Sequence, residues 1–144
     1  MANAILAAER WLYGVLTADD TLEGLIGTKV FSDVIPEYQN GATISAPYVY
    51  FTLASPGANL LSVGSHLVWS PLLYTVRYVD RTDDYTVLEE GATAVQDALH
   101  RASGSNISGT VLACIYEAPF KMTEIDRDGS IVLHLGGMYR LFVQ

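Results

Sequence analysis

The sequence predicts one α+β domain over residues 1–144, in which two main helices pack on one face of a sheet of four to five strands. Three features of the sequence favour this fold class. Residues 72–79 alternate β-branched and aromatic side chains with the period of two that is typical of a central strand. Residues 83–102 carry apolar side chains every three or four positions, as in a helix that packs on a sheet. A chain of 144 residues is long enough to bury a sizeable core as one domain.

Two helices are expected before the first long strand. Asn3 can cap a helix over residues 4–17, because apolar side chains recur there at three- and four-residue steps. Asp19 or Asp20 can cap a second, short helical turn. Gly27 would end that turn, since glycine adopts the left-handed backbone conformation without a steric penalty.

The middle of the chain alternates strand-like and ambiguous segments. Residues 29–31 allow only a brief strand, and residues 32–46 form a long loop. Residues 48–53 predict a strand with a phenolic face and an apolar face, and the apolar face should meet the helices. Residues 58–69 combine apolar side chains with glycine and serine, which indicates a mobile, protruding hairpin arm. Pro71 lacks an N–H, so the central strand either starts after it or is an edge at that end.

The last third of the chain is strand-rich. Residues 111–117 predict a third strand, which Pro119 is expected to end, and residues 121–126 predict the start of another. A turn is expected at residues 126–130. Residues 131–143 are strand-like but contain two consecutive glycines, so they form either one bulged strand or two strands.

The composition narrows the classes of function. Eight basic and 16 acidic residues give a formal charge of −8, which opposes binding of nucleic acid by attraction. Cys114 is the only cysteine and lies in an apolar run, so no disulfide is expected. No apolar run reaches the ~18–20 residues that span a bilayer, which favours a soluble chain made inside the cell. Charged residues make up only 17% of the chain, so some apolar surface is expected to serve a partner.

The sequence contains no convincing catalytic or metal-binding motif. The segment Asp126-x-Asp128-Gly129 superficially resembles a calcium loop, but its glycine is misplaced and no closing glutamate follows, so a β-turn is expected. The three histidines are dispersed without the spacing of a ligand pair. Ser65 and His66 are adjacent in an extended segment, where neighbouring side chains point apart. We therefore expect no enzyme, no catalytic residue, no cofactor and no metal.

Aromatic and apolar residues outside the expected core are the candidates for contact between subunits. Amphipathic tyrosines suit subunit interfaces, although core packing with a wet hydroxyl explains them about as well. Trp69 lies in the predicted arm, where charged substitutions should lower assembly without unfolding the monomer. The interface candidates are Tyr48, Tyr50, Leu60, Leu61, Trp69 and Tyr78.

The order of these signals resembles the small tail-completion family of long-tailed bacteriophages. The likeness begins with a short helix followed by residues 16–31 and by the segment Ala-Pro-Tyr-Val-Tyr-Phe at 46–51. It continues with Tyr-Thr-Val-Arg-Tyr-Val-Asp at 74–80, a helix from about Asp83, and a terminal strand at 138–143. The long arm at residues 58–69 and the paired glycines depart from the family's usual pattern.

This resemblance implies a tail terminator located in the virion, at the junction of head and tail, and assembled in the host cytoplasm. Such a protomer has helices on a mixed, mostly antiparallel sheet. It forms a hexameric ring on the head-proximal end of the tail tube, stops tube polymerisation and contacts the neck proteins. DNA would pass through the ring without specific binding, and an acidic bore would let it slide. The candidates for that bore are Asp83, Asp84, Asp126 and Asp128.

Two other readings of the sequence stay open. The chain is also compatible with a head-completion or neck adaptor, which has similar size and ring symmetry. A small ligand-binding or enzymatic α+β domain is the third reading, with a pocket beneath the loop at residues 32–46. The acidic charge itself is explained equally well by solubility of the free subunit.

Overall fold

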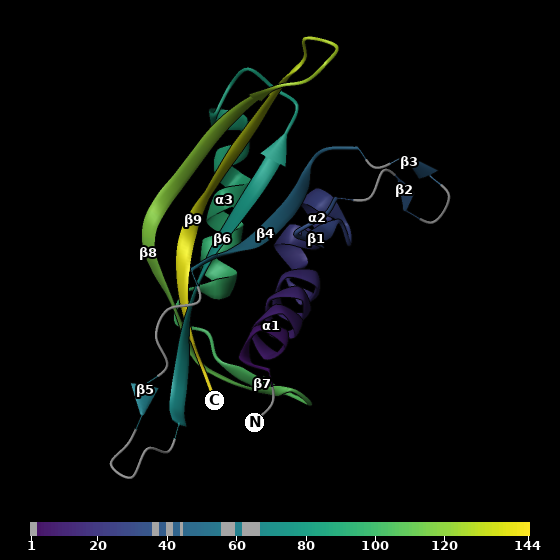
Figure 1. Cartoon of the computed structure of the whole chain (residues 1–144). Coiled ribbons are helices and arrows are strands. Elements are labelled where there is room, and N and C mark those ends of the chain that lie inside the picture. The colour runs from purple at the N-terminus through teal and green to yellow at the C-terminus, as the bar shows by residue number, and fades with distance from the viewer. Residues whose placement is uncertain (1–2, 36–37, 40–41, 44, 56–59, 62–66) are drawn as a thin grey trace.

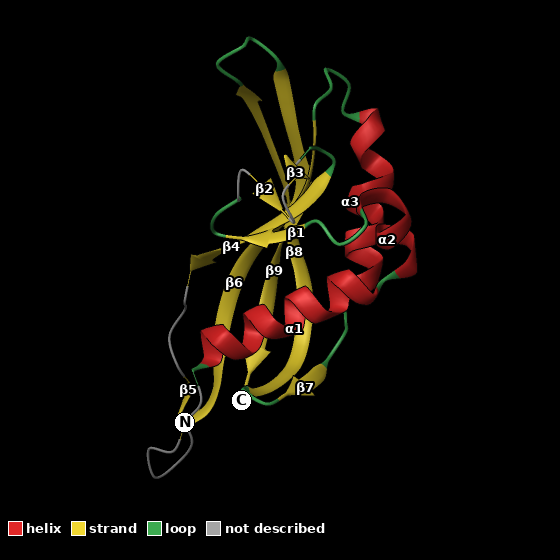
Figure 2. Ribbon diagram, turned by 90° about the vertical axis from the view of Figure 1, so that its right-hand side faces the viewer, coloured by secondary structure: helices red, strands yellow, loops and turns green. Residues whose placement is uncertain are grey.

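The computed structural model describes residues 3–35, 38–39, 42–43, 45–55, 60–61 and 67–144. In this part of the chain, three helices lie on one side of a strongly curved sheet (Figures 1 and 2). The helices are α1 (Ala4–Ala18), α2 (Asp20–Ile26) and α3 (Thr86–Leu99). The strands are β1 (Val30–Ser32), β2 (Tyr38–Gln39), β3 (Ala42–Thr43), β4 (Tyr48–Ser55), β5 (Leu60–Leu61), β6 (Leu67–Asp80), β7 (Gly104–Asn106), β8 (Gly109–Ile125) and β9 (Ile131–Val143).

The main sheet has seven strands, six of which follow the order β1-β4-β6-β9-β8-β7. β1 pairs with β4 in parallel, and every other pair in this sheet is antiparallel. β5 pairs with the start of β6, and β2 and β3 form a separate two-stranded sheet. The α+β class and the mixed, mostly antiparallel sheet are confirmed, whereas the sheet has more strands than the four to five predicted.

The core lies between the helices and one face of this sheet, which we call the helix-covered face. Leu72, Tyr74 and Val76 of β6 alternate onto this face and are buried, as their period-two spacing predicts. The hydroxyl of the buried Tyr74 donates to Oε1 of Glu9 in α1 at 3.4 Å. This contact connects the first helix to the central strand.

Local caps explain where α1 and α2 begin and where α2 ends. The Asn3 side chain accepts a hydrogen bond from the backbone N–H of Ile5 at 3.0 Å, and Asp19 accepts from Leu22 at 2.9 Å. Gly27 ends α2 with a φ of 65°. These three predicted boundaries are confirmed. α3 starts later than predicted, at Thr86.

The prediction that Pro119 ends a strand is wrong, because β8 runs through it from Gly109 to Ile125. β7 covers β8 only over residues 109–111, so the strand is an edge where Pro119 lies. Proline has no N–H to donate, and an edge strand tolerates it where the missing N–H would have faced away from the sheet. The irregularity falls instead between Tyr116 and Ala118, where the pairing register with β9 shifts.

The paired glycines of β9 do not break the strand either. β9 pairs with β6 in one unshifted register from Leu133 to Val143. A Cβ on Gly136 would collide with the carbonyl oxygen of Val76, and one on Gly137 would collide with the ring of Tyr116. Glycine is therefore required here by close approach of neighbouring groups.

The predicted arm is present in part. β5 pairs antiparallel with β6, with Leu60 opposite Trp69, and the pair extends beyond the helices at one end of the molecule (Figures 1 and 2). Residues 56–59 and 62–66 of the predicted arm lie outside the described residues. Pro71 lies within β6 between the stretches paired with β5 and β4, in agreement with the edge alternative.

Candidate assembly surface

Cys114 and His100, two side chains of types common in catalysis, have structural roles. Burial raises the pKa of the Cys114 thiol to about 12, so it stays protonated at neutral pH. Nδ1 of His100 accepts a hydrogen bond from the backbone N–H of Tyr116 at 3.1 Å. Within the described residues no group of three or more histidine, cysteine, aspartate or glutamate side chains is arranged to hold a metal ion.

Arg77 is the centre of the opposite, helix-free face of the sheet. Its guanidinium carbon lies 4.8 Å from the centroid of the Tyr50 ring and 4.9 Å from that of Phe120. Nη1 lies 3.9 Å from Sδ of Met122, and Nε is buried without a hydrogen-bond partner among the described residues. Burial lowers the pKa of Arg77, although arginine remains charged at neutral pH. The face thus holds a cation among rings with no carboxylate within ion-pair distance in the described structure.

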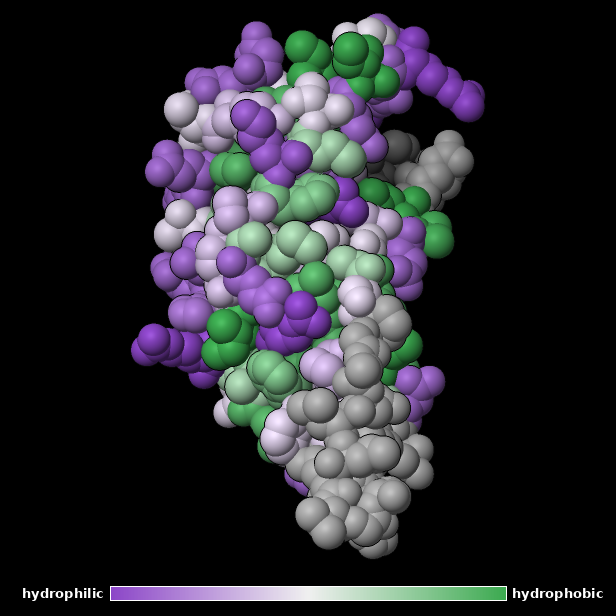
Figure 3. All heavy atoms as spheres, turned by 60° about the vertical axis from the view of Figure 1, so that its left-hand side comes forward, coloured by the Kyte–Doolittle hydropathy of each residue, from purple (hydrophilic) through white to green (hydrophobic). Residues whose placement is uncertain are grey.

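An ion pair and a hydrogen bond lie on either side of this arginine along β8 and β9. Arg140 Nε donates to Glu117 Oε1 at 2.9 Å, and a second bond joins Nη2 to Oε2 at 3.2 Å. Nε2 of the buried His134 lies 2.9 Å from Oε2 of Glu124, while its Nδ1 has no partner among the described residues. Figure 3 shows the β8 side of the molecule, where apolar and weakly polar side chains are interspersed with hydrophilic ones.

The structure separates the tyrosines that the sequence grouped as interface candidates. Tyr48 and Tyr50 of β4 are partly exposed on the helix-free face, and the Tyr50 hydroxyl donates to the carbonyl of Asp33 at 2.8 Å. Tyr78 lies on the helix-covered face, only 4% exposed, with its ring against Gly91 of α3. The alternation of β6 thus turns Tyr78 into the core, and its place in a subunit interface stays a prediction.

The four acidic bore candidates lie at one end of the molecule. Asp83 and Asp84 precede α3, and Asp126 and Asp128 form the turn between β8 and β9. Arg81 joins the two loops, since its Nη2 lies 2.8 Å from Oδ2 of Asp126. All four aspartates are exposed. The turn itself is the predicted β-turn, closed by a bond from Gly129 N–H to the Asp126 carbonyl at 2.9 Å.

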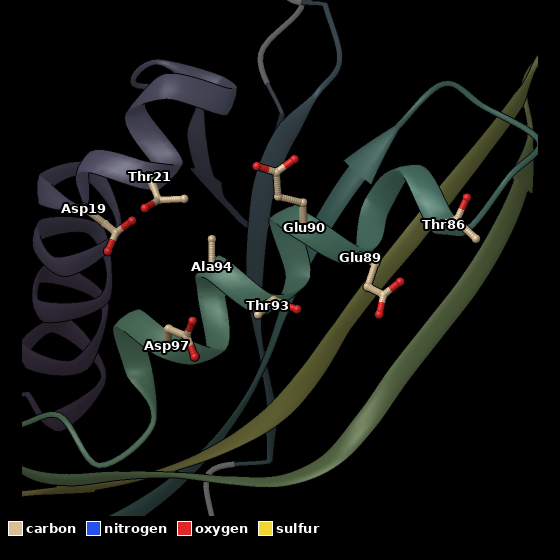
Figure 4. Close-up of a pocket in the computed structure, with 8 residues that line it drawn as sticks. All are labelled: Asp19, Thr21, Thr86, Glu89, Glu90, Thr93, Ala94 and Asp97. Carbon is tan, nitrogen blue, oxygen red and sulfur yellow. The ribbon is translucent and has the colours of Figure 1, made fainter.

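A second acidic feature lies on the helix layer. A groove of about 470 Å³ runs between the start of α2 and the outer side of α3. Figure 4 shows its lining, with Asp19 and Thr21 on one side and side chains of α3 on the other. It contains four carboxylates and no basic residue. The lining residues are Asp19, Thr21, Thr86, Glu89, Glu90, Thr93, Ala94 and Asp97.

Trp69 is an interface candidate of the predicted arm, and the structure describes its side chain. It is partly exposed at the far end of β6, and its indole Nε1 is buried without a hydrogen-bond partner among the described residues. Leu60 and Leu61 form β5 opposite this part of β6. The three residues are therefore brought together at the end of the molecule opposite the acidic loops (Figure 1).

Sequence reasoning missed Arg77, Phe120 and Met122 as parts of one surface. The sequence signal for Arg77 was a basic residue among the alternating side chains of a predicted strand. Phe120 and Met122 were assigned around a strand end at Pro119, which hid their place in β8.

The fold matches that of a known virion component. A search of solved structures finds a chain in "Virion of native gene transfer agent (GTA) particle", with a TM-score of 0.70 and 19% sequence identity. The match covers 97% of this chain and 96% of that chain. No protein-family model and no curated protein sequence matches this chain. Within the described residues, no helix is long and apolar enough to cross a membrane.

Proposed function

We propose that this chain is a structural virion protein, and that it acts as a tail terminator. The observation that carries the proposal is the match of its fold, over nearly the whole length of both chains, to a component of a gene transfer agent virion. In this proposal six copies form a ring on the head-proximal end of the tail tube. The ring stops tube polymerisation, joins the tube to the neck proteins and lets DNA pass.

The surface supports a function based on contact with other proteins. The helix-free face carries Tyr50, Arg77 and Phe120 as a partly exposed cation and ring cluster, a combination that is enriched at interfaces. The β5–β6 arm extends from the body and brings Trp69 beside β5. A closed ring needs two different patches on each subunit, and the arm is one candidate.

The acidic loops support passage of DNA without retention. Asp83, Asp84, Asp126 and Asp128 lie together at one end, and six copies would repeat this cluster around the ring axis. We propose that they line the bore. A negative lining repels the phosphate backbone, so that DNA moves through the ring without a stable contact.

Co-assembly with the tube protein tests the proposal. Purified chain added to polymerising tube protein should shorten the tubes and leave a ring at one end of each, as seen by negative-stain electron microscopy. Unchanged tube lengths would overturn the terminator function. Binding to a head-completion protein without any effect on tubes would favour the neck adaptor instead.

A matched pair of variants separates the arm from general surface effects. Trp69→Asp should leave the monomer folded but reduce ring formation, because it places a charge in the proposed contact. Val34→Asp changes a residue that is 74% exposed in the loop after β1 and should assemble normally. Equal assembly of the two variants would remove the arm from the interface.

A further inference from the structure

The acidic charge of the chain is concentrated in its helix layer. The three helices and the cap of α2 carry seven carboxylates and one arginine. The strands of the main sheet carry three basic and three acidic residues, so the sheet is neutral in sum. The charged helix residues are Glu9, Arg10, Asp19, Asp20, Glu23, Glu89, Glu90 and Asp97, and those of the sheet are Arg77, Asp80, Glu117, Lys121, Glu124 and Arg140.

Arg77 is the cation of the sheet face that lacks a carboxylate partner in the described structure. Arg140 on the same face is already paired with Glu117. The two rings that flank Arg77 keep its guanidinium in place but do not neutralise it. An anionic group that approaches this face would therefore meet a positioned and partly desolvated cation.

The groove between α2 and α3 supplies the complementary charge. Glu89 and Glu90 are exposed on α3, and Asp97 follows two turns later at the same groove. No basic residue lines the groove to compensate them. These carboxylates repel one another, and a positively charged partner would reduce that repulsion and so be bound favourably.

We propose that the helix layer of one copy packs over the helix-free face of the next copy, with the carboxylates of the α2–α3 groove facing Arg77. The two surfaces lie on opposite sides of the same subunit (Figure 2), so a rigid pair of subunits related by a twofold axis cannot make both contacts at once. The contact is head-to-tail, the type that forms a ring where the rotation between copies closes and a filament where it does not. This inference deepens the proposed function and rests on it for the ring.

Charge-reversal variants of the full chain test this contact. Glu90→Lys reverses an exposed groove carboxylate and should raise the concentration needed for half-assembly about tenfold, measured by sedimentation velocity at about 0.1 M salt. Glu23→Lys makes the same change of charge at an exposed position of α2 outside the groove and should shift it by less than about threefold.

Folding is checked separately, because Arg77 is packed between rings. Far-UV circular dichroism of each variant establishes that it is folded, and Arg77→Met removes the charge while keeping an apolar side chain in its place. Arg77→Met should assemble as weakly as Glu90→Lys.

The outcomes separate this contact from the ring itself. If the wild type assembles and Glu90→Lys behaves like Glu23→Lys, the contact is overturned and the ring stands. If Arg77→Met assembles as well as the wild type, the pairing with Arg77 is overturned. If the wild type neither self-assembles nor changes tube length, the proposed function fails together with the contact. Binding of tube or neck protein to the Arg77 face of a monomer would also overturn the contact.

Discussion

On the helix-covered face of β6, Leu72 and Val76 are at most 3% exposed, whereas Leu73 and Arg77, their neighbours on the opposite face, are partly exposed. The first face is closed by α1 and α3, whose apolar stripes exclude water. Among the described residues no helix covers the second face, whose own side chains cover it in part through the rings beside Arg77 and a hydroxyl contact of 3.2 Å between Thr52 and Thr75.

One strand thus packs into the core with one face and presents partly exposed side chains on the other. Residues on the helix-covered face are fixed by the core and have no freedom to serve a partner. On the helix-free face, Leu73 and Arg77 keep part of their surface in water, where a second protein can remove it, whereas Thr75 and Val79 are buried. Under the proposed function, a sheet with helices on one side only divides stability and assembly between its faces.

Substitutions at two adjacent leucines test the difference between the two faces most directly. Leu72→Asp places a charge in the core and should lower the free energy of unfolding by about 3–5 kcal/mol, because a buried charge has no partner there. Leu73→Asp, opposite Arg140 in the register with β9, should cost about 1–2 kcal/mol. Urea titration followed by circular dichroism measures both. Equal losses would show that the two faces are equally closed.

The strands, the helix caps and the core of this fold could be predicted from local patterns. The alternation around Tyr74 gave the central strand, and the cap residues Asn3, Asp19 and Gly27 gave helix boundaries, because these signals act over a few residues. Pro119 misled the strand prediction. Its tolerance depends on β8 being an edge, and that is a property of the whole sheet.

The candidate surface was harder to predict from the sequence. The cluster of Tyr50, Arg77 and Phe120 joins β4, β6 and β8, so it exists only once the strand order is known. The acidic groove likewise joins the start of α2 to α3. Each carboxylate by itself is compatible with an ordinary solvated helix position.

A pair of glycine substitutions tests how tightly the helices pack on the helix-covered face. Gly91→Ala should destabilise the fold by about 1–3 kcal/mol, since the new Cβ would collide with the buried ring of Tyr78. Gly14→Ala in α1 meets nothing within 4 Å and should stabilise it by about 0.5–1 kcal/mol through helix propensity. Thermal unfolding measures the two shifts. A gain in stability for Gly91→Ala would mean that α3 does not press on Tyr78 as described.

The smallest expected effect concerns His134, a buried group on the helix-free face. Burial lowers the pKa of His134, and the hydrogen bond to Glu124 opposes this while the charge of Arg77 adds to it. The unfolded state therefore takes up a proton near the ordinary pKa of about 6.5, before the folded state does. The stability that this group contributes is present above that pH and is lost as the pH falls below it.

The variant His134→Gln isolates this contribution. Glutamine keeps a donor for Glu124 but cannot be protonated, so the variant should lose less stability than the wild type between about pH 7.5 and pH 5. Urea titrations at the two pH values give the difference for each protein. Carboxylates such as Asp84, whose pKa is lowered by hydrogen bonds to Thr86, contribute equally to both proteins and cancel. An identical pH dependence of the two would mean that His134 is protonated as easily in the folded chain as in the unfolded one, and that this end of the helix-free face is open to water.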